Sequence, residues 1–175
     1  MENQGIPVMI NLLSLAKYPQ MPPYPIQLVT VGQLRLLGDG SAMLNYTESD
    51  TDEETGEVLS SEISLTFAPG RVTMVRLGDI TNTMVFVRGQ RYEGPYATPY
   101  GEMNMAVQAL DVGGRVGPEG GNLHLKYQLF FDGQYASTNE LHLEFIAEYA
   151  DTGNEKTAKP RKPEKPENGQ GKEQA

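Results

Sequence analysis

The 175-residue sequence contains no cysteine, no tryptophan and two histidines. Without cysteine, the chain can form no disulfide bond, no thiolate metal site and no cysteine nucleophile. It also lacks any run of about 20 apolar residues, the length that a membrane-spanning helix needs. No segment keeps a hydrophobic period of about 3.6 residues, so we expect little helix.

Positive charge is scarce as well. Residues 1–150 contain 8 Lys and Arg against 18 Asp and Glu, a formal charge of −10. Nucleic-acid binding rests on clustered Lys and Arg that neutralise phosphates, so we expect no nucleic-acid partner. Glu2 rather than a basic residue precedes the apolar segment 6–16, and no small-residue cleavage site follows it. We therefore expect a soluble cytoplasmic protein with no membrane association.

Large apolar side chains are missing from residues 151–175, which contain no aromatic residue and no Val, Ile, Leu or Met. Such a segment has nothing to bury, and we expect a disordered tail rich in Pro, Lys and Glu. Pro160, Pro163 and Pro166 recur with the polyproline II period, so the tail is either a solvated segment or a recruitment arm of the P-x-x-P kind. The remaining residues, 1–150, suffice for one domain with a hydrophobic core.

What the sequence does contain is alternation of apolar and polar residues. From Gly121 to Tyr149 the apolar residues share one parity and the polar residues the other, which predicts a β-hairpin with one buried face. The apolar parity comprises Leu123, Leu125, Tyr127, Leu129, Phe131, Leu141, Leu143, Phe145, Ala147 and Tyr149.

Shorter alternating segments fill most of the preceding chain. We expect short connections that carry Gly, Pro or Asp, and a Gly-rich turn over residues 113–121. Eight to ten sequential strands joined in this way predict an all-β, antiparallel up-and-down barrel, because closure removes exposed sheet edges. A two-sheet sandwich is the alternative. The strands before the final hairpin are expected at about 6–17, 26–37, 41–48, 58–67, 72–76, 82–88, 92–98 and 101–112.

Four short motifs follow one another along this pattern: Tyr46-Thr-Glu48-Ser49, Arg76-Leu-Gly78, Tyr96-Ala-Thr98-Pro-Tyr-Gly101 and Leu125-Lys-Tyr127-Gln-Leu129. In this order and spacing they resemble the YwiB-like family of small bacterial proteins of unknown function, over roughly residues 7–147. The resemblance implies a calycin-like, that is lipocalin-like, β-barrel, and it brings no activity. The G-x-W signature of true lipocalins is missing, so their secreted, hydrophobe-transporting role does not carry over.

Parity also places polar side chains inside the predicted barrel. Glu48 continues the face of Leu44, and Arg76 continues the face of Met74. Because an unpaired interior charge is costly, Glu48 and Arg76 either neutralise each other or line a cavity that orients a polar ligand. Several phenols and one threonine share inward faces with them. The candidate ligand-binding residues are therefore Glu48, Arg76, Tyr96, Thr98, Tyr100 and Tyr127.

Two other groups of residues superficially suggest metal sites. The acidic segment 48–57 has Gly56 one position too late for a calcium loop, which favours a solvated hairpin tip over weak cation binding. His124 and His142 lie on the outward parity without a third ligand, which favours cross-strand polar pairing. We therefore expect neither a metal nor a cofactor.

Three function classes remain, and no motif decides among them. The first is a non-enzymatic barrel that binds a small ligand in its interior; an anionic ligand would suit Arg76, whose planar fork pairs bidentately with carboxylates and phosphates. The second is a protein–protein interaction module with a filled barrel as scaffold. An enzyme with Glu48 as general base ranks third, because no inward His or Cys accompanies it. We expect a monomer or a homodimer, and the sequence identifies no protein partner.

Overall fold

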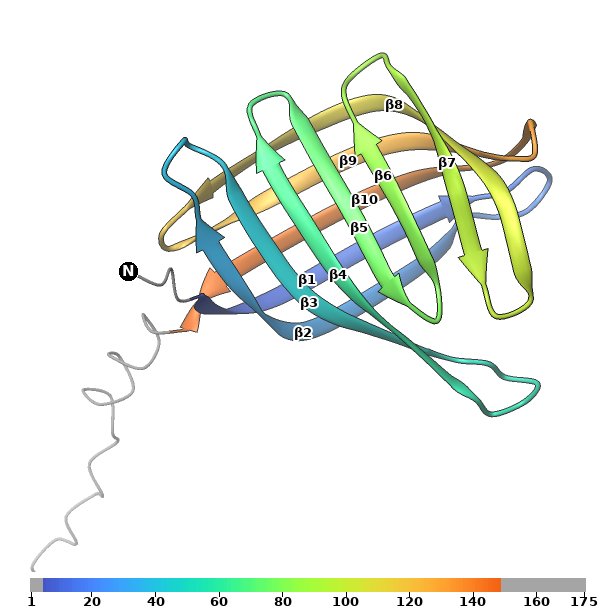
Figure 1. Cartoon of the computed structure of the whole chain (residues 1–175), viewed down its shortest axis with the longest axis horizontal. Coiled ribbons are helices and arrows are strands. Elements are labelled where there is room, and N and C mark those ends of the chain that lie inside the picture. Colours follow the sequence, from blue (N-terminus) through green and yellow to red (C-terminus); the bar gives the residue numbers. More distant parts are fainter. Residues whose placement is uncertain (1–4, 149–175) are drawn as a thin grey trace, which may run out of the picture.

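A computed structural model describes residues 5–148 of the chain. Ten strands form one closed barrel in which every strand runs antiparallel to both neighbours (Figure 1). The antiparallel up-and-down barrel predicted from the alternation is confirmed, and the two-sheet sandwich is wrong. The strands are β1 (Ile6–Lys17), β2 (Tyr24–Leu36), β3 (Ala42–Thr51), β4 (Val58–Ala68), β5 (Arg71–Gly78), β6 (Thr81–Phe86), β7 (Arg91–Thr98), β8 (Gly101–Gly117), β9 (Gly120–Phe131) and β10 (Gln134–Ala147).

The barrel closes because β1 pairs with β10 as well as with β2. The register of β1 on β10 runs without a break from Val8↔Ala147 to Lys17↔Thr138. All other neighbouring strands are consecutive in the chain, so short turns join them. In the turn between β4 and β5, Gly70 has a φ of 71°, a left-handed conformation that glycine adopts without strain.

Apolar side chains fill the middle of the barrel and extend toward the end where β1 begins and β10 ends. Val8, Leu34, Leu44, Leu65 and Leu125 are fully buried there. The rings of Phe67 and Phe145 lie 5.9 Å apart, and Phe86 meets the ring of Tyr127 edge-on at 4.9 Å. The parity predicted for the final hairpin faces this core throughout its described part, residues 121–147.

Two neighbouring strand pairs are joined over only part of their length. β2 and β3 share five residue pairs, from Gly32↔Tyr46 to Leu36↔Ala42. Beyond Gly32, residues 24–31 of β2 pair with β1 alone, and residues 47–51 of β3 pair with β4 alone. β2 and β3 therefore separate toward one end of the barrel. The pairing of β6 with β7 is shorter still and comprises Thr81↔Ala97 and Asn82↔Tyr96.

The glycines of β8 and β9 correct one prediction. The expected Gly-rich turn over residues 113–121 is wrong, because β8 continues to Gly117 and pairs with β9 as far as Gly117↔Gly120, after a bulge between Ala109 and Asp111. Glycine is needed here by close packing: a Cβ on Gly121 would overlap the carbonyl oxygen of Arg115. In sequence, glycines of this kind look the same as glycines that form a turn.

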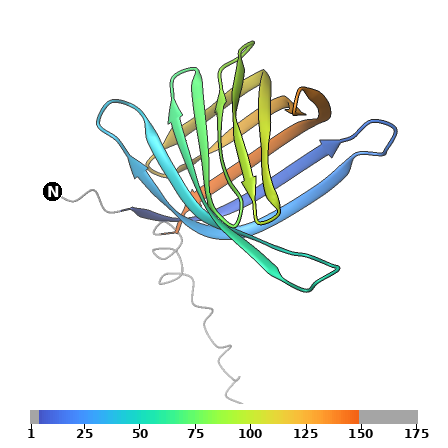
Figure 2. The same ribbon diagram turned by 45° about the vertical axis from the view of Figure 1, so that its right-hand side comes forward.

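The outer surface carries charged side chains on most strands and exposed apolar side chains on β1, β2 and β10. The hairpin of β3 and β4 projects beyond the barrel, carrying the acidic segment 48–57 (Figures 1 and 2). At its tip the Asp52 carboxylate accepts hydrogen bonds from the backbone N–H groups of Glu54 and Thr55, at 2.9 and 3.4 Å. The rings of His124 and His142 lie 4.5 Å apart on the outer face, as cross-strand neighbours.

One barrel accounts for all ten strands of the described residues. The predicted tail, residues 151–175, and Tyr149 of the predicted hairpin lie outside those residues. Within residues 5–148, no helix is both long enough and apolar enough to cross a bilayer.

The close approach at Gly121 can be tested by adding one methyl group. Gly121→Ala should lower the free energy of unfolding by about 2–3 kcal/mol, because the new Cβ would push β8 and β9 apart. Gly117→Ala is the matched control in the same strand pair, since its Cβ would lie 4.0 Å from the nearest atom, the Gly120 carbonyl oxygen. Urea unfolding curves measure both changes, and equal losses in the two variants would contradict the assignment.

Candidate functional site

The barrel is hollow at the end where β2 and β3 separate. A cavity of about 360 Å³ lies there, opposite the end where β1 begins, and we call it the Arg76 cavity. Side chains on both sides of the gap line it, Leu28 on β2 and Glu48 on β3 among them. The lining residues are Leu12, Ser14, Ile26, Gln27, Leu28, Tyr46, Glu48, Ser49, Asp50, Met74, Arg76, Met84, Tyr127 and Leu141.

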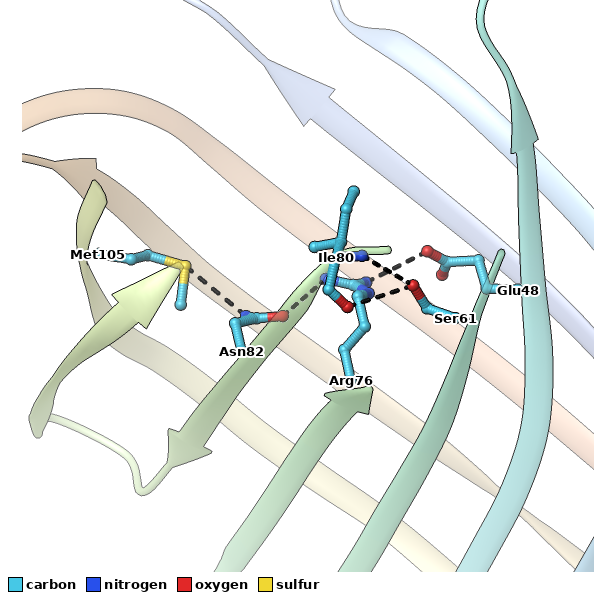
Figure 3. Close-up of polar contacts among 6 residues, drawn as sticks. All are labelled: Glu48, Ser61, Arg76, Ile80, Asn82 and Met105. Carbon is cyan, nitrogen blue, oxygen red and sulfur yellow. Dashed lines mark hydrogen bonds and ion pairs between the residues drawn. The ribbon is translucent and has the colours of Figure 1, made fainter. Parts of the chain in front are cut away.

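Arg76 lies at the centre of the polar groups of this cavity. It projects inward from β5, and its side chain is 16% exposed. Its Nη2 lies 3.4 Å from Oε1 of Glu48, and its Nη1 donates a hydrogen bond to Oδ1 of Asn82 at 3.2 Å (Figure 3). The ion pair expected from the shared parity is therefore present. Each end of the guanidinium group is tied to a different strand.

A small hydrogen-bond network holds the turn that carries this arrangement. Oγ of Ser61, on β4, donates to the carbonyl oxygen of Ile80 at 3.2 Å and accepts from the Ile80 N–H at 3.3 Å (Figure 3). The carboxylate of Asp79 accepts from the N–H of Ser60 at 2.9 Å. These bonds fix the β5–β6 turn against β4. This turn fixes the positions of Arg76 and Asn82, which lie on either side of it and are paired across β5 and β6.

The hydrogen bonding of Arg76 is incomplete. Its Nε is buried and has no hydrogen-bond partner among the described residues. Asn82 is 4% exposed, and its amide nitrogen contacts the sulfur of Met105 at 3.8 Å, a weak acceptor. A buried donor without a partner is costly, so the position of Arg76 lowers the stability of the fold at this point.

Two buried tyrosines add phenol groups to the cavity. Tyr46 is 4% exposed and Tyr127 is 9% exposed. Burial raises the pKa of both; for Tyr127 the positive charge of Arg76 offsets part of the rise, Glu48 adds to it, and the pKa reaches about 12. Both phenols are therefore neutral near pH 7. Within residues 5–148, neither hydroxyl has a hydrogen-bond partner.

The structure brings together fewer of the predicted residues than expected. Glu48, Arg76 and Tyr127 line the cavity, whereas Tyr96, Thr98 and Tyr100 do not, so the expected convergence of all six needs correction. Tyr96 packs edge-on against Phe131 at 5.3 Å.

Thr98 and Tyr100 belong to the β7–β8 turn. The Thr98 hydroxyl donates to the carbonyl oxygen of Gly101 at 2.9 Å and accepts from the N–H of Tyr100 at 3.1 Å. The side chain of Tyr100 is 74% exposed. Thr98 and Tyr100 thus share a parity because they lie at the end of β7 and in the turn after it. The motif Tyr96-Ala-Thr98-Pro-Tyr-Gly101 therefore has a structural role in this turn.

Among the polar residues of this region that sequence reasoning missed are Tyr46, Asp50 and Asn82. Tyr46 shares the parity of Glu48 on β3, so the same argument could have included it. Asp50 was expected in a loop, because β3 was predicted to end at residue 48 and it continues to Thr51. Nothing in the sequence pointed to Asn82 except its place on β6. Its position opposite Arg76 follows from the register of β5 and β6, which the sequence does not give.

A second hollow, of about 370 Å³, lies at the opposite end of the barrel. Its lining consists of turn backbone, apolar side chains and glycines, with Arg71 as its one charged residue. Glu48, Arg76 and the two buried tyrosines do not line it. The cluster of buried, incompletely bonded polar groups therefore places the candidate site in the Arg76 cavity.

The chemistry that the Arg76 cavity supports is recognition of a small molecule by shape and hydrogen bonds. Leu12, Met74, Met84 and Leu141, which are each at most 7% exposed, provide apolar walls. The phenols can donate or accept hydrogen bonds. Glu48, a possible proton acceptor, is held in its ion pair with Arg76.

Comparisons with known proteins bear on the fold. A family model described as "Domain of unknown function (DUF1934)" matches residues 18–143. The crystal structure of the YwiB protein from Bacillus subtilis matches with a TM-score of 0.69 at 16% sequence identity, covering 82% of this chain and 93% of that chain. A structure of unknown function from Bacteroides ovatus matches at 12% identity with a TM-score of 0.33, covering 80% of this chain and 41% of that chain. No curated protein matches the chain.

These matches confirm the resemblance to YwiB-like proteins inferred from the four motifs. At 16% identity, the likeness to YwiB shows a shared fold and nothing about activity. The calycin-like relationship that the resemblance implies stays a prediction.

The ion pair predicts a specific loss of stability. Arg76→Met should lower the free energy of unfolding by about 1–3 kcal/mol, because the Glu48 carboxylate and the Asn82 carbonyl oxygen would lose their donor in a mostly buried site. Arg35→Met, on the exposed face of β2, should change it by less than about 0.5 kcal/mol. Urea denaturation measures the unfolding free energies of both variants. An Arg76→Met variant as stable as the parent protein would contradict a tightly held ion pair.

The raised phenol pKa predicts a fall in stability at alkaline pH. In the unfolded chain a tyrosine ionises near pH 10, whereas Tyr127 in the folded protein ionises at about 12. Its contribution is therefore fully present below pH 10 and is lost as the pH rises from 10 to 12. Tyr127→Phe cannot ionise, so its unfolding free energy should fall less steeply over this range, while the exposed Tyr100→Phe should behave like the parent protein. Parallel curves for Tyr127→Phe and the parent would contradict the assignment.

Proposed function

The chain belongs to the DUF1934 family, a family of unknown function, and we propose that it is a non-enzymatic binding barrel that holds a small amphipathic molecule in the Arg76 cavity. The observation that carries the proposal is the combination found in that cavity. Apolar walls, the phenol groups of two buried tyrosines and an arginine paired with a glutamate face a space of about 360 Å³.

The size of the cavity supports this function. Ligand-binding sites in proteins usually have volumes of roughly 300–1,000 Å³ and combine mostly apolar walls with a few fixed polar groups. A barrel whose interior served as scaffold alone would be expected to fill with its own side chains. This interior is filled in the middle, where Leu44, Leu65 and Leu125 are buried, and hollow at both ends, and of the two hollows the Arg76 cavity is the one lined by an ion pair and two buried tyrosines.

The gap between β2 and β3 offers a way in. Residues 24–31 of β2 are not paired with β3. Ile26, which belongs to this segment and lines the cavity, is 49% exposed. A small molecule could therefore reach the cavity without breaking a strand pair. Its polar group would meet Glu48, Arg76 and the two phenols, and its apolar body would lie against the leucine and methionine side chains.

The structure changes the argument for an anionic ligand. The sequence left open whether Arg76 neutralises Glu48 or orients a polar ligand, and a carboxylate or a phosphate suited the second alternative. In the barrel, its charge is already matched by Glu48, and one of its N–H groups is bonded to Asn82. An anion would have to compete with Glu48, so Arg76 no longer favours one.

Binding is better supported than catalysis. A general base has to be free to take a proton, and Glu48 is engaged with Arg76. Neither His124 nor His142 lines the cavity. An enzymatic role would need a nucleophile or a base that reaches the ligand from another position.

A protein-interaction module is the second candidate, favoured by the outer face of β2. Val29 and Val31 are 61% and 58% exposed, and the strand has a free edge beside them. An extended segment of a partner could add to such an edge. The cytoplasmic location and the monomeric or dimeric state expected from the sequence stay predictions.

Blocking the cavity tests the proposal. Native mass spectrometry of the protein purified from its own host should detect a retained small molecule, and Leu28→Trp, which fills the cavity from β2, should abolish that retention. Val29→Trp is the matched control, because the neighbouring side chain points outward. The chain has no natural tryptophan, so fluorescence reports the folding of both variants. Retention that survives Leu28→Trp, or no retained molecule in any form, would contradict the proposal.

A further inference from the structure

The charges that face the Arg76 cavity do not balance. Three charged residues line it: Glu48, Asp50 and Arg76. The Arg76 guanidinium is compensated by Glu48 at 3.4 Å, which leaves the exposed carboxylate of Asp50 in excess. The lining therefore carries a formal charge of about −1 at pH 7, since carboxyl groups are ionised there and arginine is always protonated.

The surroundings of the cavity mouth add to this imbalance. The β3–β4 hairpin projects at this end of the barrel (Figure 2), and it carries acidic residues, as do three further turns at the same end. Lys17 and Arg76 are the basic residues of the same described segments. The acidic residues are Glu48, Asp50, Asp52, Glu53, Glu54, Glu57, Asp79, Glu102 and Asp132.

The opposite end has a different balance. Most of the basic residues of the described chain lie on the turns and strand ends there, and they include Arg35, Arg71, Arg88, Arg91 and Arg115. The barrel is thus electrically polarised along its axis, with the Arg76 cavity at the negative end. A mouth surrounded by one sign of charge raises the local concentration of ligands of the other sign and lowers that of like-charged ligands.

We propose that the Arg76 cavity selects small organic cations, in which a protonated amine is attached to an apolar body. This inference rests on the proposed function and names the class of ligand. The ammonium group would lie near the Asp50 and Glu48 carboxylates, and the apolar body would lie against Leu28, Met74 and Met84.

The two tyrosines complete the recognition of such a ligand. Their neutral hydroxyl groups have free acceptor lone pairs, which an ammonium N–H can use. The faces of their rings attract cations, an interaction that strengthens when water is excluded. Tyr46 and Tyr127 are both more than nine-tenths buried, so a cation beside them is partly removed from water.

An anion of the same shape would be rejected. Its carboxylate would meet two carboxylates of the lining, and the Arg76 Nη2 could serve it only by releasing Glu48. The cavity should therefore discriminate between molecules that differ only in the sign of the head group. This discrimination is the observable consequence of the charge imbalance.

Three hexyl compounds test the inference on the full chain: hexylamine, 1-hexanol and hexanoate, at pH 7.5 and equal ionic strength. Isothermal titration calorimetry should give hexylamine an affinity roughly fivefold or more above that of 1-hexanol, and hexanoate an affinity below it. Ammonium chloride should not bind measurably, because the apolar body is needed. Raising the salt concentration should reduce the preference for hexylamine.

One pair of variants separates the cavity charge from the general charge of this end. Asp50→Asn should lower the affinity for hexylamine by roughly threefold and leave that for 1-hexanol unchanged. Glu102→Gln removes the same charge from an exposed residue of β8 outside the cavity lining, and it should have a smaller effect.

The possible failures are distinct. If hexanoate binds as tightly as 1-hexanol or more tightly, or if Asp50→Asn leaves hexylamine binding unchanged, the charge selection is overturned and the binding barrel stands. If none of the three hexyl compounds binds the folded protein, the cavity is not a binding site, and both proposals are overturned together.

Discussion

The pairing of β1 with β10 is the constraint on which the rest of the structure depends. Ten residue pairs, from Val8↔Ala147 to Lys17↔Thr138, join the first strand to the last and remove the two sheet edges that an open meander would expose. Once the sheet is closed, each strand has an inside and an outside. The alternation of apolar and polar residues then decides which side chains form the core and which meet water.

Closure also creates the space in which a site can form. The interior of a ten-stranded barrel is wide, and the buried leucines and phenylalanines fill its middle. At the other end, β2 and β3 part beyond Gly32 and Tyr46, and the lining changes from aliphatic groups to Glu48, Arg76 and two phenols. The place where β2 and β3 are unpaired is thus also the place where the interior is hollow and its lining is polar.

Much of this architecture could be predicted from the sequence, because a period of two residues specifies a face. The inward orientation of Arg76 and its approach to Glu48 followed from the parity of β3 and β5. Parity does not specify the level of a residue along the barrel axis, which depends on register and on strand tilt. Thr98 and Tyr100 were therefore assigned to a site from which they are separated, and the glycines of β8 were mistaken for a turn. Tyr96 lies in the same cross-strand row as Arg76 and Asn82, but its ring packs against Phe131 and does not line the cavity.

The polar end of the barrel is poorly explained by stability alone. A mostly buried ion pair is seldom more stabilising than apolar side chains of similar size, and here the Nε of Arg76 also lacks a partner. The positions before it on the same face of β5, Val72 and Met74, are apolar and pack into the core, so the strand accommodates apolar residues readily. The hydroxyls of Tyr46 and Tyr127 are likewise unsatisfied by the described part of the chain. The ion pair and the two tyrosines border the cavity, so an occupant could offer hydrogen bonds to them, whereas the buried Nε of Arg76 is closed off from the cavity.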